Sequence, residues 1–559
     1  MKRRLALLLS VLLCLSLFPT ALAEAEDPFA PFAEEVEIHI GMGVDPADST
    51  LPAEDSVDDN FFTRYLKDTL NIKVVVDWTA AGGDGFNQKV SLCIASNSLP
   101  DALVLNNRAQ FIACVESDML YDLSEVYDKY AASMTKAIYN TSEGKAMDAV
   151  TIGGKMLALP IQTAGADGVH VMFIQQNWLD ELGLKVPQTV EEIYETAKAF
   201  KEAGLAGSST IPILGAQKDS RVYTNFLNSA NARAGFEPIF SAMKAYPGYF
   251  LMGEDGKVTY GTLSAQMRDA LELLAGWYAE GLIDPEFATR DYYTDPINAN
   301  SCGIFFGPWW SIGYGNGDSF KNNPDVNWQS YPVFADDGTW NVKMKNVGDM
   351  YTVVNKNVSE EVAEAVIKMN NICLRDETRF DSGEFPERKD LNIEWFPLRN
   401  PSAAFDDVEF TYDQLIKILN GEASPDDYLE GNEMYKLLIT DVNWVDKIVT
   451  GYEKDQPLQA SMFDFALNES ECQRLYSILI GDRPYATTPI DNEIISLVYE
   501  TNSTIDRYWA NLEALEDAMV RSIITGNADI TAFDTFVEQW LNEGGQKILD
   551  SVQEYVDSL

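Results

Sequence analysis

Positive charge and histidine are scarce in this sequence. Its 559 residues include 41 Lys and Arg against 87 Asp and Glu, for a formal net charge of −46. Such a surface repels phosphate backbones, so we expect no nucleic-acid partner. Only two histidines occur, His39 and His170, each in a stretch expected to form a strand. The motifs HExxH, GxSxG and GxxxxGK[ST] are missing, so the sequence predicts no metal, cofactor or catalytic residue.

Cysteine pairs are missing as well. Beyond the first 23 residues the chain keeps an odd number of cysteines, none in a Cys-x-x-Cys pair: Cys93, Cys114, Cys302, Cys373 and Cys472. A disulfide framework is not implied for a chain of this length. We therefore expect buried free thiols, and a pairing of Cys93 with Cys114 stays open.

Long apolar runs are confined to the amino-terminal segment. Residues 2–4 are basic, residues 5–18 are apolar, and residues 21–23 read Ala-Leu-Ala. This order predicts a secretory signal that is cleaved near Ala23, and hence an exported, extracellular or cell-envelope protein. Cys14 lies inside the apolar core, so the segment lacks a lipobox and a lipid anchor is not expected.

The next part of the chain alternates strand and helix patterns. Apolar strands are predicted at 36–40, 72–78 and 101–105, with helices at 59–70 and 86–96 between them. This β-α-β-α-β order predicts a mostly parallel sheet with right-handed crossovers. Ligands of such sheets lie beyond the carboxyl ends of the strands. Those ends are residues 41–43, 78–83 and 106–108.

Residues 153–203 carry the most specific local pattern. Residues 169–174 are apolar at nearly every position, which predicts a parallel strand covered on both faces. Thr189 is a good N-cap, Glu192 completes a capping box, and Gly204 is placed to end the helix between them. The segment therefore predicts a second α/β layer. Beyond residue 411 the chain is largely helical.

Five segments in order resemble one protein family: residues 99–103 (LPDAL), 154–160 (GKMLALP), 177–189 (NWLDELGLKVPQT), 280–287 (EGLIDPEF) and 525–557. They are similar to family 1 extracellular solute-binding proteins of ABC transporters, in particular the LipO-like and YtcQ-like sugar-binding subgroup. The resemblance implies an α/β, two-lobed periplasmic-binding-protein-like fold of type II. Mixed sheets flanked by helices and a helical C-terminal region belong to that fold.

The resemblance also implies how the chain is divided. We expect a signal peptide at 1–23, a tether at 24–35, an N-terminal lobe of 36–162 plus 297–350, and a C-terminal lobe of 163–296 plus 351–559. The chain should cross between the lobes near 161–163, near 294–300 and after Tyr351. Longer relatives often carry a calcium loop after the capped helix. Residues 202–210 lack the aspartates that such a loop needs, so we predict no calcium there.

A sugar site needs aromatic platforms and planar polar side chains. The Gly-Pro-Trp-Trp turn at 307–310 suits this best, because relatives that bind oligosaccharides place an indole under a sugar ring there. Further candidates follow strand ends, predicted crossings or irregular segments. The complete predicted ligand set is Trp78, Asn106, Asn107, Arg108, Gln162, Arg221, Tyr223, Trp309, Trp310, Asp349 and Trp395.

The function that follows is a monomeric receptor without enzymatic activity. It would bind a small ligand, an oligosaccharide above all, and deliver it to the permease subunits of an ABC importer by closure of two lobes. Two alternatives stay open. One is a secreted carbohydrate-active enzyme, because 87 acidic residues offer many carboxylate pairs. The other is an adhesin or signalling module on the same fold.

Overall fold

The computed structural model describes residues 27–557, apart from 46, 82, 219, 229–231, 314–316 and 455. The predicted signal segment lies outside these residues. Residues 27–35, predicted as a tether, instead pack along the first lobe. The Phe32 N–H donates to the Leu70 carbonyl (2.9 Å), and the Lys368 ammonium donates to the Ala30 carbonyl (2.9 Å). Hydrogen bonds and buried rings thus fix this stretch to the domain surface.

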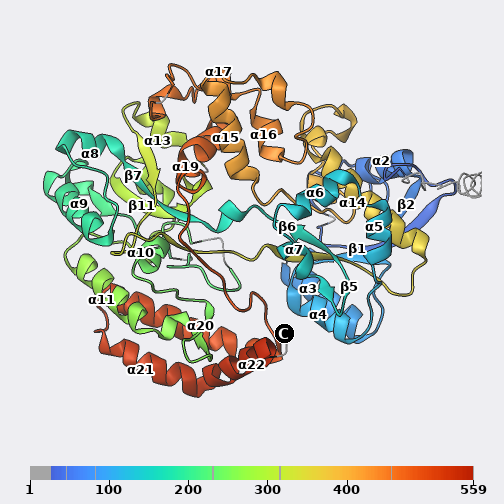
Figure 1. The fold of residues 1–559 in the computed structure, drawn as a ribbon, viewed down its shortest axis with the longest axis horizontal. Helices are drawn as coiled ribbons and strands as arrows, with labels where there is room; N and C mark the ends of the chain where they lie inside the picture. Colours follow the sequence, from blue (N-terminus) through green and yellow to red (C-terminus); the bar gives the residue numbers. More distant parts are fainter. Residues whose placement is uncertain are drawn as a thin grey trace, which may run out of the picture.

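The first lobe is built on a five-stranded sheet in the order β2-β1-β3-β14-β6. Its strands are β1 (Val36–Met42), β2 (Ile72–Thr79), β3 (Ala102–Leu105), β6 (Leu159–Gln162) and β14 (Gly348–Val354). The strands β1, β2 and β3 are parallel, as the sequence predicts, and β14 runs antiparallel to both neighbours. Helices α2 (Phe61–Leu70), α3 (Gly83–Ala95), α4 (Arg108–Glu116) and α14 (Glu360–Asp381) surround it (Figure 1).

The second lobe is built on a four-stranded sheet in the order β12-β7-β11-β8. Its strands are β7 (His170–Gln175), β8 (Ile211–Ile213), β11 (Cys302–Pro308) and β12 (Trp328–Tyr331). Every residue of β7 is buried, which confirms the predicted double coverage. The predicted parallel pairing is wrong, because β7 runs antiparallel to both β11 and β12. Helices α8 (Gln176–Leu182) and α9 (Val190–Ala203) pack beside this sheet (Figure 1).

Helix α9 has both predicted ends. The Thr189 hydroxyl accepts from the Glu192 N–H (3.3 Å), and the Glu192 carboxylate accepts from the Gln188 N–H (2.7 Å). Gly204 closes the helix with φ of 62°, a left-handed conformation that glycine adopts without steric cost. Local capping chemistry is therefore sufficient to place this helix.

The predicted division between the lobes is wrong for two segments. Strand β11, assigned to the first lobe, pairs antiparallel with β7 in the second sheet. Strand β14 does complete the first sheet, but it reaches past residue 350 and leads into α14, which also packs in the first lobe. Both strands are apolar, and apolarity records burial without recording which sheet a strand joins.

Three segments cross between the lobes: 163–164, 345–347 and 400–405. They are hydrogen bonded to one another through Thr163 N to Val347 O (3.1 Å) and Gly165 N to Phe405 O (2.8 Å). A Cβ atom on Gly165 would lie 2.6 Å from the Phe405 ring, so only glycine fits this contact. The crossing at 161–163 is as expected. The one expected near 294–300 is not found, because α12 (Thr294–Asn298) lies within the second lobe.

Beyond residue 405 the chain is largely helical, as predicted, and its helices form two groups (Figure 1). One group, α15 (Asp407–Leu419), α16 (Lys436–Asp441), α17 (Val445–Ile448), α18 (Glu469–Tyr476) and α19 (Arg483–Thr487), covers one side of the second sheet. The other group, α20 (Ser503–Ile524), α21 (Thr531–Trp540) and α22 (Gln546–Asp557), packs with α11 (Ala265–Ala279). Within the described residues, no helix combines the length and apolarity needed to cross a membrane.

Candidate functional site

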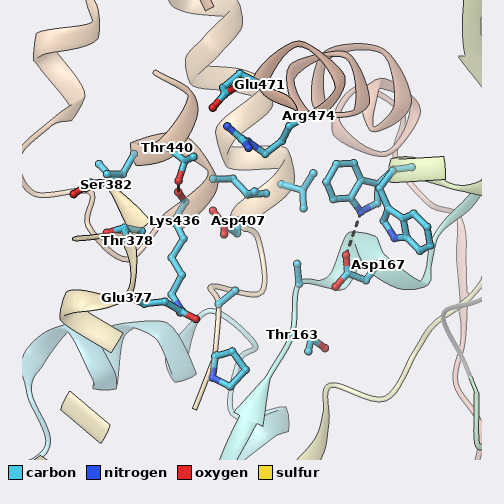
Figure 2. Close-up of a pocket in the computed structure, with 18 of the residues that line it drawn as sticks. Thr163, Asp167, Glu377, Thr378, Ser382, Asp407, Lys436, Thr440, Glu471 and Arg474 are labelled. Carbon is cyan, nitrogen blue, oxygen red and sulfur yellow. Dashed lines mark hydrogen bonds and ion pairs between the residues drawn. The ribbon is translucent and has the colours of Figure 1, made fainter. Parts of the chain in front are cut away.

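A cavity of about 1100 Å³ opens between the lobes beside the crossing segments. The first lobe contributes α14 to its wall, and the second lobe contributes α15, α16, α18 and the turn after β11. Figure 2 shows charged and hydroxyl side chains converging on it from these elements. The lining residues are Thr163, Ala164, Asp167, Trp309, Trp310, Glu377, Thr378, Arg379, Ser382, Arg399, Pro401, Ala403, Asp407, Val408, Lys436, Leu437, Ile439, Thr440, Trp444, Glu471 and Arg474.

Two adjacent indoles, those of Trp309 and Trp310, form one aromatic part of the wall, and the indole of Trp444 lines it as well. Trp309 and Trp310 stand on the 3₁₀ turn that follows β11. The Trp309 Nε1–H donates to Asp167 Oδ1 (3.2 Å), which fixes the orientation of that ring. The Arg233 guanidinium lies over the Trp310 ring, 4.7 Å from its centroid, a cation–π arrangement. The cavity thus offers a held aromatic surface next to a carboxylate.

Ion pairs join the two lobes across the cavity. Glu377 on α14 accepts from the Arg399 guanidinium (2.7 Å) and from the ammonium of Lys436 on α16. These partners hold the pKa of Glu377 below its ordinary value despite burial. On the far wall, Arg474 binds Asp441, which is fully buried, at 2.7 Å. The wall therefore carries planar carboxylate and guanidinium groups that ion pairs already hold in place.

Asp407 is the most buried carboxyl in the lining, 2% exposed. Burial raises its pKa to about 7, so both protonation states are populated near neutral pH. Hydroxyls of Thr163, Thr378 and Thr440 lie around the same space (Figure 2). A wall of hydroxyl, carboxyl and guanidinium groups can donate to and accept from a polyhydroxylated ligand.

A smaller cavity of about 260 Å³ lies at the carboxyl ends of β1 and β3. Gly41, Gly43 and Asn106 line it, in agreement with the predicted ligand edge of the first sheet. Asn106 Oδ1 is buried there and has no hydrogen-bond partner among the described residues. Arg399 borders both this cavity and the larger one, so the two spaces adjoin.

Three predicted ligand residues have structural partners at the first lobe. Trp78 packs against Phe86 (5.7 Å between rings) and fills the space above Gly41. Asn107 caps α4 by accepting from the Gln110 N–H (2.9 Å). Arg108 ion-pairs with Glu500 of the second lobe (3.3 Å). Trp309, Trp310 and Asn106 line the two cavities described above, whereas Trp78, Asn107 and Arg108 line neither of them.

Four other predicted ligand residues, Gln162, Arg221, Tyr223 and Trp395, line neither of these two cavities. Gln162 is fully buried, and its amide donates to the carbonyls of Ile138 (2.8 Å) and Ala403 (2.9 Å). These bonds hold the end of β6 against the crossing segment 400–405. Arg221 pairs with Glu513 (2.5 Å) on α20, and Tyr223 donates to Glu516 (2.5 Å) on the same helix. Trp395 is completely buried in the first core.

The side chain of Asp349 is outside the described part of the structure.

Most of the polar residues that line the larger cavity were not predicted from the sequence. Glu377, Lys436, Thr440, Glu471 and Arg474 lie on helices whose mixed polar faces read like any solvated helix surface. A sequence signal that would have singled them out is absent, because their convergence depends on how the helices pack.

Catalytic and metal chemistry find little support in the side chains. The His39 ring pairs with Asp77 (2.7 Å) in the first lobe, whereas His170 is buried in the second and accepts from the Ala232 N–H (3.3 Å). Burial lowers the pKa of His170, in keeping with a neutral ring. In the part of the chain that the structure covers, no group of three or more His, Cys, Asp or Glu residues is arranged to hold a metal ion. The five cysteines of the described residues are buried free thiols.

Two α/β lobes joined by three crossing segments, with a polar and aromatic cavity between them, define a two-lobed solute-binding protein. Comparison with protein families agrees with this class. Residues 60–366 match the family of bacterial extracellular solute-binding proteins, and the chain belongs to that family.

Curated relatives and solved structures agree with this assignment. The chain is 24% identical over 274 residues to the fructooligosaccharide ABC transporter substrate-binding protein FusA of Streptococcus pneumoniae serotype 4, covering 46% of this chain and 48% of that protein. It is 25% identical over 260 residues to lipoprotein LipO of Bacillus subtilis, covering 45% and 48%. The chain thus spans about half the length of these curated relatives.

A solved structure extends the likeness to almost the whole fold. The HMO-binding, ABC-transporter-associated solute-binding protein of Bifidobacterium longum infantis superposes with a TM-score of 0.56 at 14% identity, covering 94% of this chain and 99% of that one. This confirms the two-lobed fold that the sequence predicts.

Proposed function

We propose that this protein is an exported receptor that binds an oligosaccharide between its lobes and delivers it to the permease subunits of an ABC importer. The observation that carries the proposal is the inter-lobe cavity, whose wall combines two neighbouring indoles with hydroxyl, carboxyl and guanidinium groups from both lobes. Sugars present apolar ring faces and a belt of hydroxyls, and such a wall complements both.

The arrangement of the wall also favours binding coupled to lobe movement. Glu377 and Thr378 belong to the first lobe, whereas Lys436 and Trp310 belong to the second. A ligand that contacts both groups stabilises one relative position of the lobes over others, which is how a two-lobed receptor signals occupancy. The family membership and the oligosaccharide named for the pneumococcal relative support the same function.

We assign Trp309, Trp310 and Asn106, from the predicted ligand set, as contacts of the bound sugar. The proposed receptor acts as a monomer and has no catalytic role. Export by a signal cleaved near Ala23, without a lipid anchor, completes the proposal.

The test is calorimetry of the mature chain against oligosaccharides of plant, host and microbial origin. We expect a binder with a dissociation constant in the micromolar range or below. Trp310→Ala should weaken binding at least tenfold, because a buried aromatic anchor contributes roughly 2 kcal/mol or more. The control, Tyr292→Ala, removes an aromatic ring that is 65% exposed and lies outside the cavity lining, and it should leave the affinity unchanged. Absence of any binder across the panel, or release of shortened products, would refute the receptor assignment.

A further inference from the structure

We infer that the inter-lobe cavity selects uncharged oligosaccharides over those that carry carboxylates. This inference rests on the proposed function and adds the charge class of the ligand. It depends on the four basic side chains that line the cavity among the described residues, Arg379, Arg399, Lys436 and Arg474, and on the acids that surround them.

The basic groups are already engaged by protein carboxylates. Arg379 binds Asp376 at 2.7 Å, and Arg474 binds Asp441 at 2.7 Å. Both aspartates are fully buried. Turning Arg474 toward a ligand would leave Asp441 as a buried, uncompensated carboxylate, which is strongly unfavourable. Asp376 is also bound by Arg375 at 2.7 Å, so Arg379 shares this acid with a second base and pairs with the exposed Glu384 as well. Arg474 therefore neutralises the protein and is not available to a uronic acid.

The other two bases share one acid. Arg399 and Lys436 both bind Glu377, and Arg399 binds Glu394 as well at 2.7 Å. Arg233, which lies over the Trp310 ring, is exposed and does not belong to the lining. Each lining base thus has at least one carboxylate partner.

Two carboxyl groups of the lining can still accept hydrogen bonds from a ligand. Glu471 lines the cavity, and its Oε2 is buried without a hydrogen-bond partner in the described chain. Asp407 lines it too, and its pKa near 7 leaves a fraction ionised at neutral pH. Both groups can accept from a sugar hydroxyl, and both repel a second carboxylate in a space of reduced dielectric.

A further carboxyl group lies behind the wall. Asp482 is fully buried, and across the residues that the structure describes neither of its carboxyl oxygens has a partner. Its acidic neighbours include Glu409 and the lining residue Asp167. Burial and these neighbours hold the pKa of Asp482 well above its ordinary value, which favours the neutral, protonated form. The repulsion of an anionic ligand therefore rests on Glu471 and Asp407.

The experiment compares ligand pairs that differ in charge alone. Tetragalacturonate is paired with its fully methyl-esterified form, and a mannuronate tetrasaccharide with mannotetraose. Affinities are measured calorimetrically at pH 7.5 and at two salt concentrations, because screening by salt reports a charge effect. We expect the uncharged member of a bound pair to bind at least tenfold more tightly, with a smaller ratio at high salt.

Two variants test the residues. Glu471→Gln and Asp407→Asn should each reduce the ratio of the affinity for the uncharged ligand to that for the charged ligand at least threefold. If Asp407→Asn folds poorly, Glu471→Gln still tests the inference. Glu422→Gln, which removes an exposed acid paired with Lys454, is the matched control and should leave the ratio unchanged. Equal or tighter binding of the uronates overturns the inference and leaves the receptor function standing. Failure of all sugars to bind overturns both.

Discussion

The buried ion pair Lys343–Glu237 offers a direct test of the second lobe. Lys343 is 2% exposed and Glu237 4% exposed, and the ammonium lies 3.0 Å from Glu237 Oε1. The ammonium also donates to the carbonyls of Thr224 (2.8 Å) and Pro247 (2.6 Å). The Glu237 carboxylate accepts from the N–H of Thr224 (2.7 Å). Burial lowers the pKa of Lys343, but the glutamate and two carbonyls hold its charge.

The expected cost of breaking the pair follows from these distances. At 3.0 Å and an effective dielectric of about 20, the attraction is roughly 5–6 kcal/mol, before desolvation is subtracted. Lys343→Met leaves the Glu237 carboxylate buried and uncompensated, so we expect the free energy of unfolding to fall by about 3–5 kcal/mol. Adding Glu237→Gln removes that charge, so the double variant should lose less than the sum of the two single variants, by about 2–3 kcal/mol.

The assay is urea denaturation of the single and double variants followed by circular dichroism. Two lobes can unfold separately, so hydrogen exchange should localise the loss to the second lobe. Lys244→Met is the matched control, because Lys244 pairs with Asp337 where both side chains are about half exposed, and it should cost less than about 1 kcal/mol. A loss for Lys343→Met as small as that control, or additivity in the double variant, would show that the pair is not buried as described.

Two further predictions concern pH and the contact between the lobes. Burial raises the pKa of Glu409 from its ordinary 4.5 to about 8, so the stability linked to its proton is full below about pH 4.5 and is lost as pH rises through 8. Glu409→Gln should therefore flatten the decline of melting temperature between pH 5 and 8, and an unchanged slope would contradict the buried placement. Arg108→Gln removes the inter-lobe ion pair with Glu500 and should widen the distribution of lobe angles in small-angle scattering, whereas Lys73→Gln, which removes an exposed pair within the first lobe, should not.

Much of the fold was predictable because local chemistry sets it. The strands of the first sheet follow from apolar stretches separated by helical spacing, and α9 follows from Thr189, Glu192 and Gly204. Sheet membership was not predictable in the same way. Strands β11 and β14 are both largely apolar runs, and β7, the antiparallel partner of β11, and β3, a partner of β14, each lie more than a hundred residues away in the sequence. Pairing at such distance is decided by tertiary packing.

The candidate site was predictable only where backbone geometry creates it. Trp309 and Trp310 stand on a turn after a buried strand, and the Gly-Pro-Trp-Trp pattern shows such a turn. Trp395 misled because an aromatic residue on an irregular segment can be covered by neighbouring elements as readily as it can face a cavity. Lys436 and Arg474 could not be predicted as cavity residues from the sequence, because their ion-pair partners lie on other helices.

The place of β14 in the first sheet has a consequence for how the protein matures. Strand β3 ends at residue 105 and β14 begins at 348, yet the two lie side by side, and β6 pairs only with β14. The first lobe therefore cannot complete its sheet until the whole middle of the chain has been made. Until β14 has been made, the edge of β3 that β14 covers stays unpaired, and such an edge is prone to wrong pairing. Slow assembly of this kind keeps a newly made chain unfolded for longer, which would suit the export that we propose.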